Sequence, residues 1–490
     1  MNLSLFMNPV GTVHTSIPQF VRLEQTLAFY LRSEDDAKRL GAILCARIST
    51  EECMARQQLF SDLQQESSKA HFTEIYRCIC DYQRSIERYE HFRKDFYAPL
   101  FYFEALSSYF MLVEQIAKTP AYLYMSPLMH GVIQVCSMQC QTHAYQQMKQ
   151  SWEVVRNDAN HRESITIDIK KRDRMFPASS VVPDKKMGSM LDDFADFLDI
   201  PQTVRPNITR LPGDVYQQLF VQPESYYGKI QAFYETYQQQ DWLDLKVDPQ
   251  SFRFFIDMDI LFSRLREFGL TLCLPKMNGE RDFQLEDLYD LSLCTQDVVL
   301  NSFEERNPYD VFIVSGANGG GKTCFLRAVC WCVFLAASGC YIPARSGVIP
   351  CNLELYAFVG VEESGNSGIY LQEKQFIEVI LKKTTVRTML FLNEIMIGTG
   401  EMKACRELSG ITERVIQQSA WLFCATHNYA YVDWAAHTYP AITMLQPVLC
   451  GNDHVRTFRV EKVTRENRSY SQDILQKYGL RKEDLEVDCL

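Results

Sequence analysis

The chain has 490 residues, of which 47% are hydrophobic and 23% charged, a composition that excludes a disordered protein. This length exceeds what one ordinary hydrophobic core supports, so two to four domains are expected. The formal net charge of −11 excludes an overall basic field that attracts nucleic acid, so DNA contact would need a local patch. Residues 170–174 and 185–186, rich in lysine and arginine, are the candidate patch. A solvated polar loop explains these residues equally well.

The sequence gives no sign of export or of a membrane segment. Residues 1–20 lack a charged stretch followed by a long apolar core, so we expect no signal peptide. The longest apolar stretch, residues 328–342, is too short to span a bilayer. The 17 cysteines are odd in number and scattered, which favours reduced thiols over a disulfide framework. We therefore predict a cytoplasmic protein that makes no membrane contact.

The N-terminal part of the chain predicts mainly helices. From residue 75, apolar residues recur at alternating steps of four and three, which is typical of one face of a long helix. These positions are Ile75, Ile79, Tyr82, Ile86 and Tyr89. Helical patterns continue over residues 101–116, 123–152, 216–242 and 256–268, and residues 164–169 alternate like a short strand.

From about residue 270 the pattern changes to short apolar runs that alternate with helical stretches. This alternation predicts an α/β domain in which helices cover a sheet. The expected strands are residues 311–314, 353–359, 389–392, 422–425 and 441–445, with an edge strand at 455–463. The expected helices are residues 324–337, 372–382 and 407–418, with a polar helix at the end of the chain. The predicted fold is thus mixed, with a helical region at 1–265 and an α/β domain at 266–490.

A glycine-rich loop follows the first of these strands and fits the phosphate-binding pattern G-x-x-x-x-G-K-[ST]. Glycines let backbone N–H groups approach the phosphates, Lys322 can reach the β- and γ-phosphates, and the Thr323 hydroxyl can bind Mg²⁺. A chance glycine-rich turn is the alternative, but the preceding strand and the following apolar helix argue against it. We predict that ATP and Mg²⁺ bind here. The loop residues are Gly316, Ala317, Asn318, Gly319, Gly320, Gly321, Lys322 and Thr323.

Two further strands end in residues suited to nucleotide hydrolysis. The run 389–392 leads into Asn393 and Glu394, where Glu394 can deprotonate a water molecule and Asn393 can support Mg²⁺. An amide brings no negative charge, so the affinity for Mg²⁺ should be lower than with an aspartate. The run 422–425 leads to His427, which could contact the γ-phosphate or the attacking water. The alternatives are a carboxylate that merely caps a strand and an ordinary packed histidine.

With these motifs in order, the chain resembles the MutS family of mismatch-repair ATPases. The glycine-rich loop is similar to the family's G-P-N-M-G-G-K-S, with Asn318 kept and Gly319 in place of methionine. The acidic strand resembles D-E-I-G-R-G-T, the histidine strand L-F-A-T-H, and three further segments Y-V-P-A, S-Y-G-I-x-V-A and L-D-x-L. The matching segments are 256–261, 316–323, 341–344, 390–399, 422–427 and 469–475.

The resemblance implies a helical lever and clamp region followed by an ABC-type P-loop ATPase domain of the MutS kind. It also implies that the protein is a homodimer that binds DNA. It implies that Lys322 and Thr323 hold phosphate and Mg²⁺, with Glu394 as general base and His427 as a sensor of the γ-phosphate. In that family a serine-containing loop of the partner subunit also contacts each ATP. The corresponding residues here would be Ser364 and Ser367.

Some positions depart from the family pattern. Asn393 replaces the metal-supporting aspartate, and Met396 and Ile397 replace a Gly-Arg pair, so hydrolysis should be slowed more than binding. The family's mismatch-reading module, with its Phe-x-Glu wedge, has no room here. We therefore expect DNA to be recognised through backbone charge and shape.

We therefore predict a dimeric MutS-like ATPase that couples its nucleotide state to DNA binding. The alternative is a slowly hydrolysing, nucleotide-gated scaffold that switches a protein partner without specific DNA recognition. A transporter or SMC-type ATPase would need an L-S-G-G-Q-like signature before the Glu394 strand, whereas the only similar segment, residues 408–410, lies after it.

Overall fold

The computed structural model describes residues 2–7, 9–95, 97–158, 226–240, 242–243, 245–279, 281–295, 297–304, 308–316, 319–359, 368–396, 399–450 and 455–463. The chain separates into two compact units, one from residues 1–5 and 62–253 and one from residues 6–61 and 254–490. This grouping differs from the predicted division at residues 265 and 266. Compactness depends on long-range contacts, such as the 3.1 Å hydrogen bond from the Ala357 N–H to Ser16 Oγ, which no local pattern reveals.

The first unit is built around a long apolar helix. Helix α6 (Ala98–Ala117) packs against α5 (Glu66–Phe92), α7 (Pro127–Gln141) and α11 (Tyr226–Tyr237), and α8 (His143–Asp158) packs against α7 and α11. The predicted apolar face of α5 is confirmed, because Ile75, Ile79, Tyr82 and Tyr89 are buried and Ile86 is half-buried. Strand β1 (Asn2–Leu3) pairs in parallel with β4 (Lys246–Val247).

Several predictions for this unit cannot be compared with the structure. The predicted strand at 164–169 and the basic patch at 170–174 and 185–186 lie outside the described residues.

The predicted helix at 123–152 is instead two helices. Thr142 between them is extended, and its hydroxyl accepts a hydrogen bond from the Tyr145 N–H of the second helix.

The second unit begins with small elements that the sequence patterns did not separate. These are β2 (Gly11–Thr12), α1 (Ser16–Phe20), α2 (Leu23–Leu31), α3 (Glu34–Leu44), β3 (Ala46–Arg47) and α4 (Thr50–Asp62). Helix α12 (Pro249–Glu267) leads the chain back into this unit, as predicted for residues 256–268. None of the helices in the described ranges combines the length and apolar character needed to cross a membrane.

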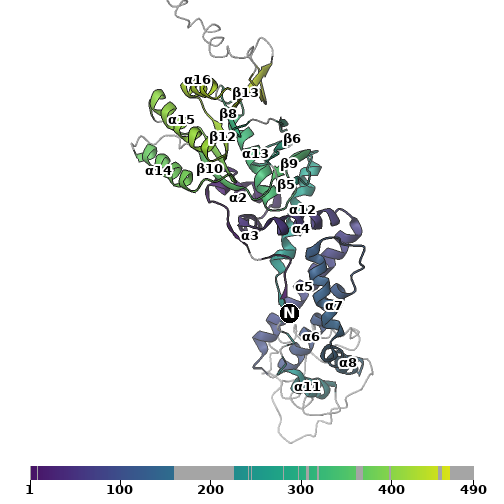
Figure 1. Ribbon diagram of the computed structural model, residues 1–490. Helices are drawn as coiled ribbons and strands as arrows, with labels where there is room; N and C mark the ends of the chain where they lie inside the picture. Colours follow the sequence, from purple (N-terminus) through teal and green to yellow (C-terminus); the bar gives the residue numbers. More distant parts are fainter. Residues whose placement is uncertain are drawn as a thin grey trace, which may run out of the picture. The chain divides into compact units, whose positions relative to one another are not determined.

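A six-stranded sheet forms the centre of the second unit (Figure 1). Its strands lie in the order β10 (Glu354–Val359), β11 (Thr388–Asn393), β12 (Trp421–Ala425), β8 (Val311–Val314), β13 (Thr443–Cys450) and β14 (Val455–Lys462). The first five run parallel, and β14 is antiparallel to β13 at the edge. All six predicted strands are confirmed, including the edge position of the last.

Helices cover the sheet on both faces, which explains why the central strands are continuous apolar runs. On one face, α14 (Gly368–Lys383), α15 (Glu401–Gln417) and α16 (Tyr429–Thr438) pack on residues such as Ile313, Leu392 and Leu422. On the other face lie α13 (Lys322–Ala337) and a cluster of phenylalanine rings. Within that cluster Phe312 and Phe423 have centroids 4.8 Å apart.

A smaller four-stranded sheet lies beside α13 and was not predicted. Its order is β5 (Lys276–Asn278), β9 (Ser346–Pro350), β6 (Gln284–Leu288) and β7 (Asn301–Phe303). These strands have only three to five residues and contain polar side chains, so they show no long apolar run. A short 3-10 helix, Leu291–Leu293, follows β6 and also contacts α13.

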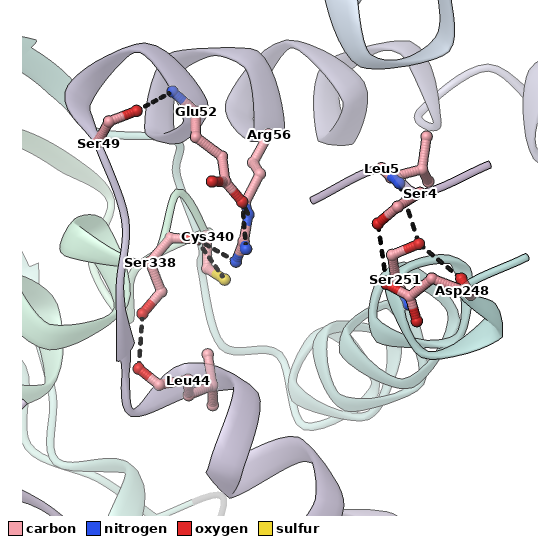
Figure 2. A network of polar contacts seen from close by, with 10 residues as sticks. All are labelled: Ser4, Leu5, Leu44, Ser49, Glu52, Arg56, Asp248, Ser251, Ser338 and Cys340. Carbon is pink, nitrogen blue, oxygen red and sulfur yellow. Dashed lines mark hydrogen bonds and ion pairs between the residues drawn. The ribbon is translucent and has the colours of Figure 1, made fainter. Parts of the chain in front are cut away.

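A buried ion pair on α4 supports the far end of α13 (Figure 2). Glu52 and Arg56, 0% and 2% exposed, are joined by hydrogen bonds of 3.0 and 2.6 Å from Nε and Nη2 of Arg56 to Glu52 Oε1. Nη1 of Arg56 donates to the carbonyl of Ser338, the C-cap residue of α13, at 3.4 Å. A positive charge at a helix C-terminus is favourable because the helix dipole is negative there.

Candidate functional site

The predicted site residues follow three neighbouring parallel strands. In the sheet register, Asn393 of β11 lies opposite Ala425 of β12, and Ala425 lies opposite Val314 of β8. The carboxyl ends of β11, β12 and β8 therefore meet at one edge of the sheet. Glu394 follows β11, His427 follows β12 and the glycine-rich loop follows β8, each within two residues of the end of the strand.

The glycine-rich loop, residues 316–321, connects β8 to α13 with backbone angles that favour glycine. The φ angles of Gly316, Gly319 and Gly321 are +123°, +70° and +99°, a region that residues with a β-carbon rarely adopt. Gly321 is also the residue directly before α13, so the positive end of that helix faces the loop. Gly320 is buried, and the predicted Ala317 and Asn318 lie outside the described residues.

Lys322 is the most buried charge at the site, with a side chain 3% exposed. Its Nζ donates to the carbonyl of Gly316 at 3.0 Å, lies 2.9 Å from His427 Nε2 and 3.7 Å from Glu394 Oε1. Burial lowers the pKa of Lys322, although the nearby Glu394 carboxylate opposes this shift. The ammonium group is therefore held inside the site rather than extended into solvent.

Glu394 and His427 contact each other directly, with His427 Nε2 2.9 Å from Glu394 Oε1. This hydrogen bond lowers the pKa of the Glu394 carboxyl, with a further contribution from Lys322, while burial works in the opposite direction. Nε2 carries either one hydrogen or one lone pair, so it cannot donate to Glu394 and accept from Lys322 at once. The two contacts are alternatives set by the proton on Nε2.

The next pair of side chains presents oxygen atoms. Thr323 Oγ1 donates to Asn393 Oδ1 at 2.9 Å, and Asn393 is 5% exposed. Hydroxyl and amide oxygens are acceptable ligands for Mg²⁺, which prefers oxygen, and the Glu394 carboxylate is the negative group beside them. The donor set thus fits Mg²⁺, with less negative charge than an aspartate at residue 393 would give. Within the described residues, no cluster of three or more His, Cys, Asp or Glu side chains could hold a metal by itself.

A buried carboxylate that the sequence did not single out supports the acidic turn. Glu373 on α14 is 4% exposed and accepts a hydrogen bond of 3.1 Å from the Met396 N–H. Burial raises the pKa of Glu373. Glu394 and Met396 have φ angles of +52° and +64°, which are unfavourable for residues with side chains, so this turn needs such support. Polar residues surround Glu373 in the sequence, so no local pattern distinguishes it from an exposed helical glutamate.

The structure thus brings together the predicted residues Lys322, Thr323, Asn393, Glu394 and His427. Asn428 holds the histidine turn, since its side chain accepts from the Tyr431 N–H at 2.8 Å and caps α16. Ser364 and Ser367, predicted to contact a partner's nucleotide, lie outside the described residues, as does the segment 469–475.

These observations define a class: a mixed protein whose parallel sheet presents a glycine-rich loop, a carboxylate and a histidine at its carboxyl edge. Comparison with known proteins gives the family. Residues 312–481 match the family model described as MutS domain V. This part of the chain is therefore similar to domain V of MutS-family proteins.

Individual relatives match part of the chain at low identity. The DNA mismatch repair protein MutS of Thermus thermophilus is 23% identical over 181 residues, which is 36% of this chain and 22% of the relative. The Endonuclease MutS2 of Bacillus velezensis is 24% identical over 37% of this chain and 23% of its own length. The DNA mismatch repair protein MSH4 of Arabidopsis thaliana is 26% identical over 30% and 19%. The matched region is therefore about a fifth of each relative.

Proposed function

We propose that this chain binds and hydrolyses ATP with Mg²⁺ and couples its nucleotide state to DNA binding. The observation that carries this proposal is the approach of Lys322, Glu394 and His427 at the carboxyl edge of β8, β11 and β12, within 3.7 Å of one another. Ligands of α/β sheets bind at this edge. A glycine-rich loop, a buried cation, a carboxylate and a histidine are the groups that triphosphate hydrolysis needs.

Each side chain has a distinct task in the proposed reaction. The N–H groups of the glycine-rich loop and the Lys322 ammonium would bind the phosphates. Thr323 and Asn393 would hold Mg²⁺, whose charge would offset that of the phosphates. Glu394 accepts a proton from the attacking water. Glu394 is present as a carboxylate at neutral pH, because its pKa is lowered from a value that is already acidic. His427, through Nε2, would orient Glu394 or contact the γ-phosphate.

The DNA and dimer parts of the proposal come from the family. The relatives from Thermus thermophilus and Arabidopsis thaliana are named DNA mismatch repair proteins, and the one from Bacillus velezensis is named an endonuclease. We infer that two copies of this chain pair through their ATPase domains, with Ser364 and Ser367 facing the partner's nucleotide. DNA would be recognised by backbone charge and shape, because the net charge of −11 leaves only local basic surface for it.

A turnover and binding assay on the full chain tests this function. ATP hydrolysis should be measured alone and with duplex, mismatched and branched DNA, and DNA binding should be titrated with salt. We expect hydrolysis that DNA alters and that Lys322→Ala abolishes, and DNA affinity that falls as salt rises. Absence of ATP binding would overturn the proposal, and absence of DNA binding even at low salt would remove its DNA part.

A slowly hydrolysing scaffold that switches a protein partner is the second candidate, favoured by the bond between Thr323 and the uncharged Asn393. Asn393→Asp should raise the apparent affinity for Mg²⁺ by on the order of tenfold and increase turnover, because a carboxylate adds negative charge beside the metal. A Mg²⁺ titration of the hydrolysis rate measures both effects. A large gain in turnover would identify Asn393 as a natural brake and support the scaffold, whereas an unchanged rate would contradict a limitation at the metal site.

A further inference from the structure

The hairpin of β13 and β14 lies along the glycine-rich loop. A β-carbon built on Gly316 would lie 3.0 Å from Cδ of Pro447 in β13, and one on Gly321 would lie 3.5 Å from the carbonyl of Phe458 in β14. The glycines of this loop thus leave room for a neighbouring strand as well as for a ligand. The edge of the sheet next to β8 is therefore part of the wall of the candidate site.

Arg456 on β14 makes the closest of these approaches. A β-carbon on Gly319 would lie 2.6 Å from Nη1 and 3.2 Å from Cζ of Arg456, so the guanidinium group occupies the space that a side chain at residue 319 would fill. The family pattern has methionine at this position of the loop. Gly319 therefore leaves the space that the long cationic side chain of Arg456 occupies.

The strand that carries Arg456 is held firmly in place. The Val460 N–H donates to Asn301 Oδ1 at 2.7 Å, and Thr457 Oγ1 donates to the carbonyl of Val448 at 2.6 Å. Phe458 has a φ angle of +58°, an unfavourable conformation that these bonds on either side help to maintain. The hairpin therefore presents Arg456 to the loop from a fixed backbone.

The charges around Arg456 favour an anion. The guanidinium group is exposed, and within the described part of the chain no carboxylate forms an ion pair with it. It lies against the loop that leads into Lys322 and the positive end of α13. A polyanion bound along this loop of backbone N–H groups would attract both Arg456 and Lys322. A guanidinium group can form two parallel, charge-assisted hydrogen bonds with phosphate.

We infer that Arg456 is a phosphate-binding residue that contacts the polyphosphate of the bound nucleotide from β14, an inference that rests on the proposed ATP binding. Arg456 adds a cation from outside the glycine-rich loop. Its guanidinium group lies where a side chain at residue 319 would otherwise be. It should favour nucleotides that carry several phosphates over adenosine.

Calorimetric titration of the full chain with ATP, ADP and adenosine tests the inference. Arg456→Ala should weaken ATP and ADP binding about tenfold or more and leave adenosine binding unchanged, and Arg456→Lys should restore part of the loss. The matched control is Arg459→Ala, which removes the same charge from an exposed position on the same strand and should change ATP affinity less than twofold. Thermal melting checks that each variant is folded.

The outcomes separate this inference from the function on which it rests. If the wild-type chain binds ATP and Lys322→Ala does not, but Arg456→Ala binds ATP as well as Arg459→Ala does, the role of Arg456 is overturned and the proposed function stands. If Arg456→Ala weakens ATP and adenosine equally, the arginine supports the fold of the site and does not bind phosphate. If the wild-type chain does not bind ATP, both proposals fail.

Discussion

Replacing Glu394 with glutamine is expected to lower ATP turnover by a factor of about 10² to 10⁴, the usual contribution of a general base. The amide has nearly the same shape but cannot accept the proton of the attacking water. ATP binding should persist or become tighter, because the variant removes a negative charge that lies 3.7 Å from Lys322 in the wild-type chain. Turnover under saturating ATP and a separate binding titration measure the two effects.

The control for this variant is Glu413→Gln, which removes the same charge from the exposed surface of α15 and should leave turnover unchanged.

The pH dependence of wild-type turnover gives a second check. Because the pKa of Glu394 is lowered, its ionised form is present above that value and is lost only when the pH falls below the ordinary range of a glutamate. Glu394 should therefore cause no loss of wild-type turnover between pH 8 and pH 6. Turnover of Glu394→Gln close to the wild-type rate would assign the base to another group.

The central part of the fold and site could be predicted from the sequence because strong local patterns coincide with the sheet. Strands buried on both faces are continuous apolar runs, so β8, β11 and β12 were found at nearly their observed bounds. Parallel strands share their carboxyl edge, so residues that follow them must meet there. This rule brings together Glu394, His427 and the start of the glycine-rich loop, and the phosphate-loop pattern adds Lys322.

Features that depend on long-range packing could not be predicted in this way. The sheet of β5, β6, β7 and β9 consists of short strands with polar residues, and helix α1 packs on β10, more than 300 residues later in the chain. The support from Glu373 requires knowledge of how α14 lies against the turn at Met396. The complementarity of Gly319 and Arg456 requires the path of β14 beside the loop.

The largest expected effect on stability comes from breaking the buried pair on α4 (Figure 2). Arg56→Met should lower the free energy of unfolding by about 3–5 kcal/mol, because it keeps much of the side-chain volume but leaves the carboxylate of Glu52 buried without its partner. The variant also removes the guanidinium group that lies 4.1 Å from the ring centre of Phe6 and donates to the Ser338 carbonyl at the end of α13. Urea unfolding followed by circular dichroism measures the loss.

A double variant decides whether the uncompensated charge causes this loss. Adding Glu52→Gln to Arg56→Met removes the buried negative charge, so much of the lost stability should return, since replacing both members of a buried pair costs less than removing one. Arg345→Met is the surface control, because Arg345 pairs with Asp287 and Glu286 on the exposed surface, where solvent weakens ion pairs, so stability should change little. If the double variant is less stable than Arg56→Met, the packing of Arg56 at the end of α13 contributes more to stability than its pairing with Glu52, and the charge of Glu52 is not what makes Arg56 necessary.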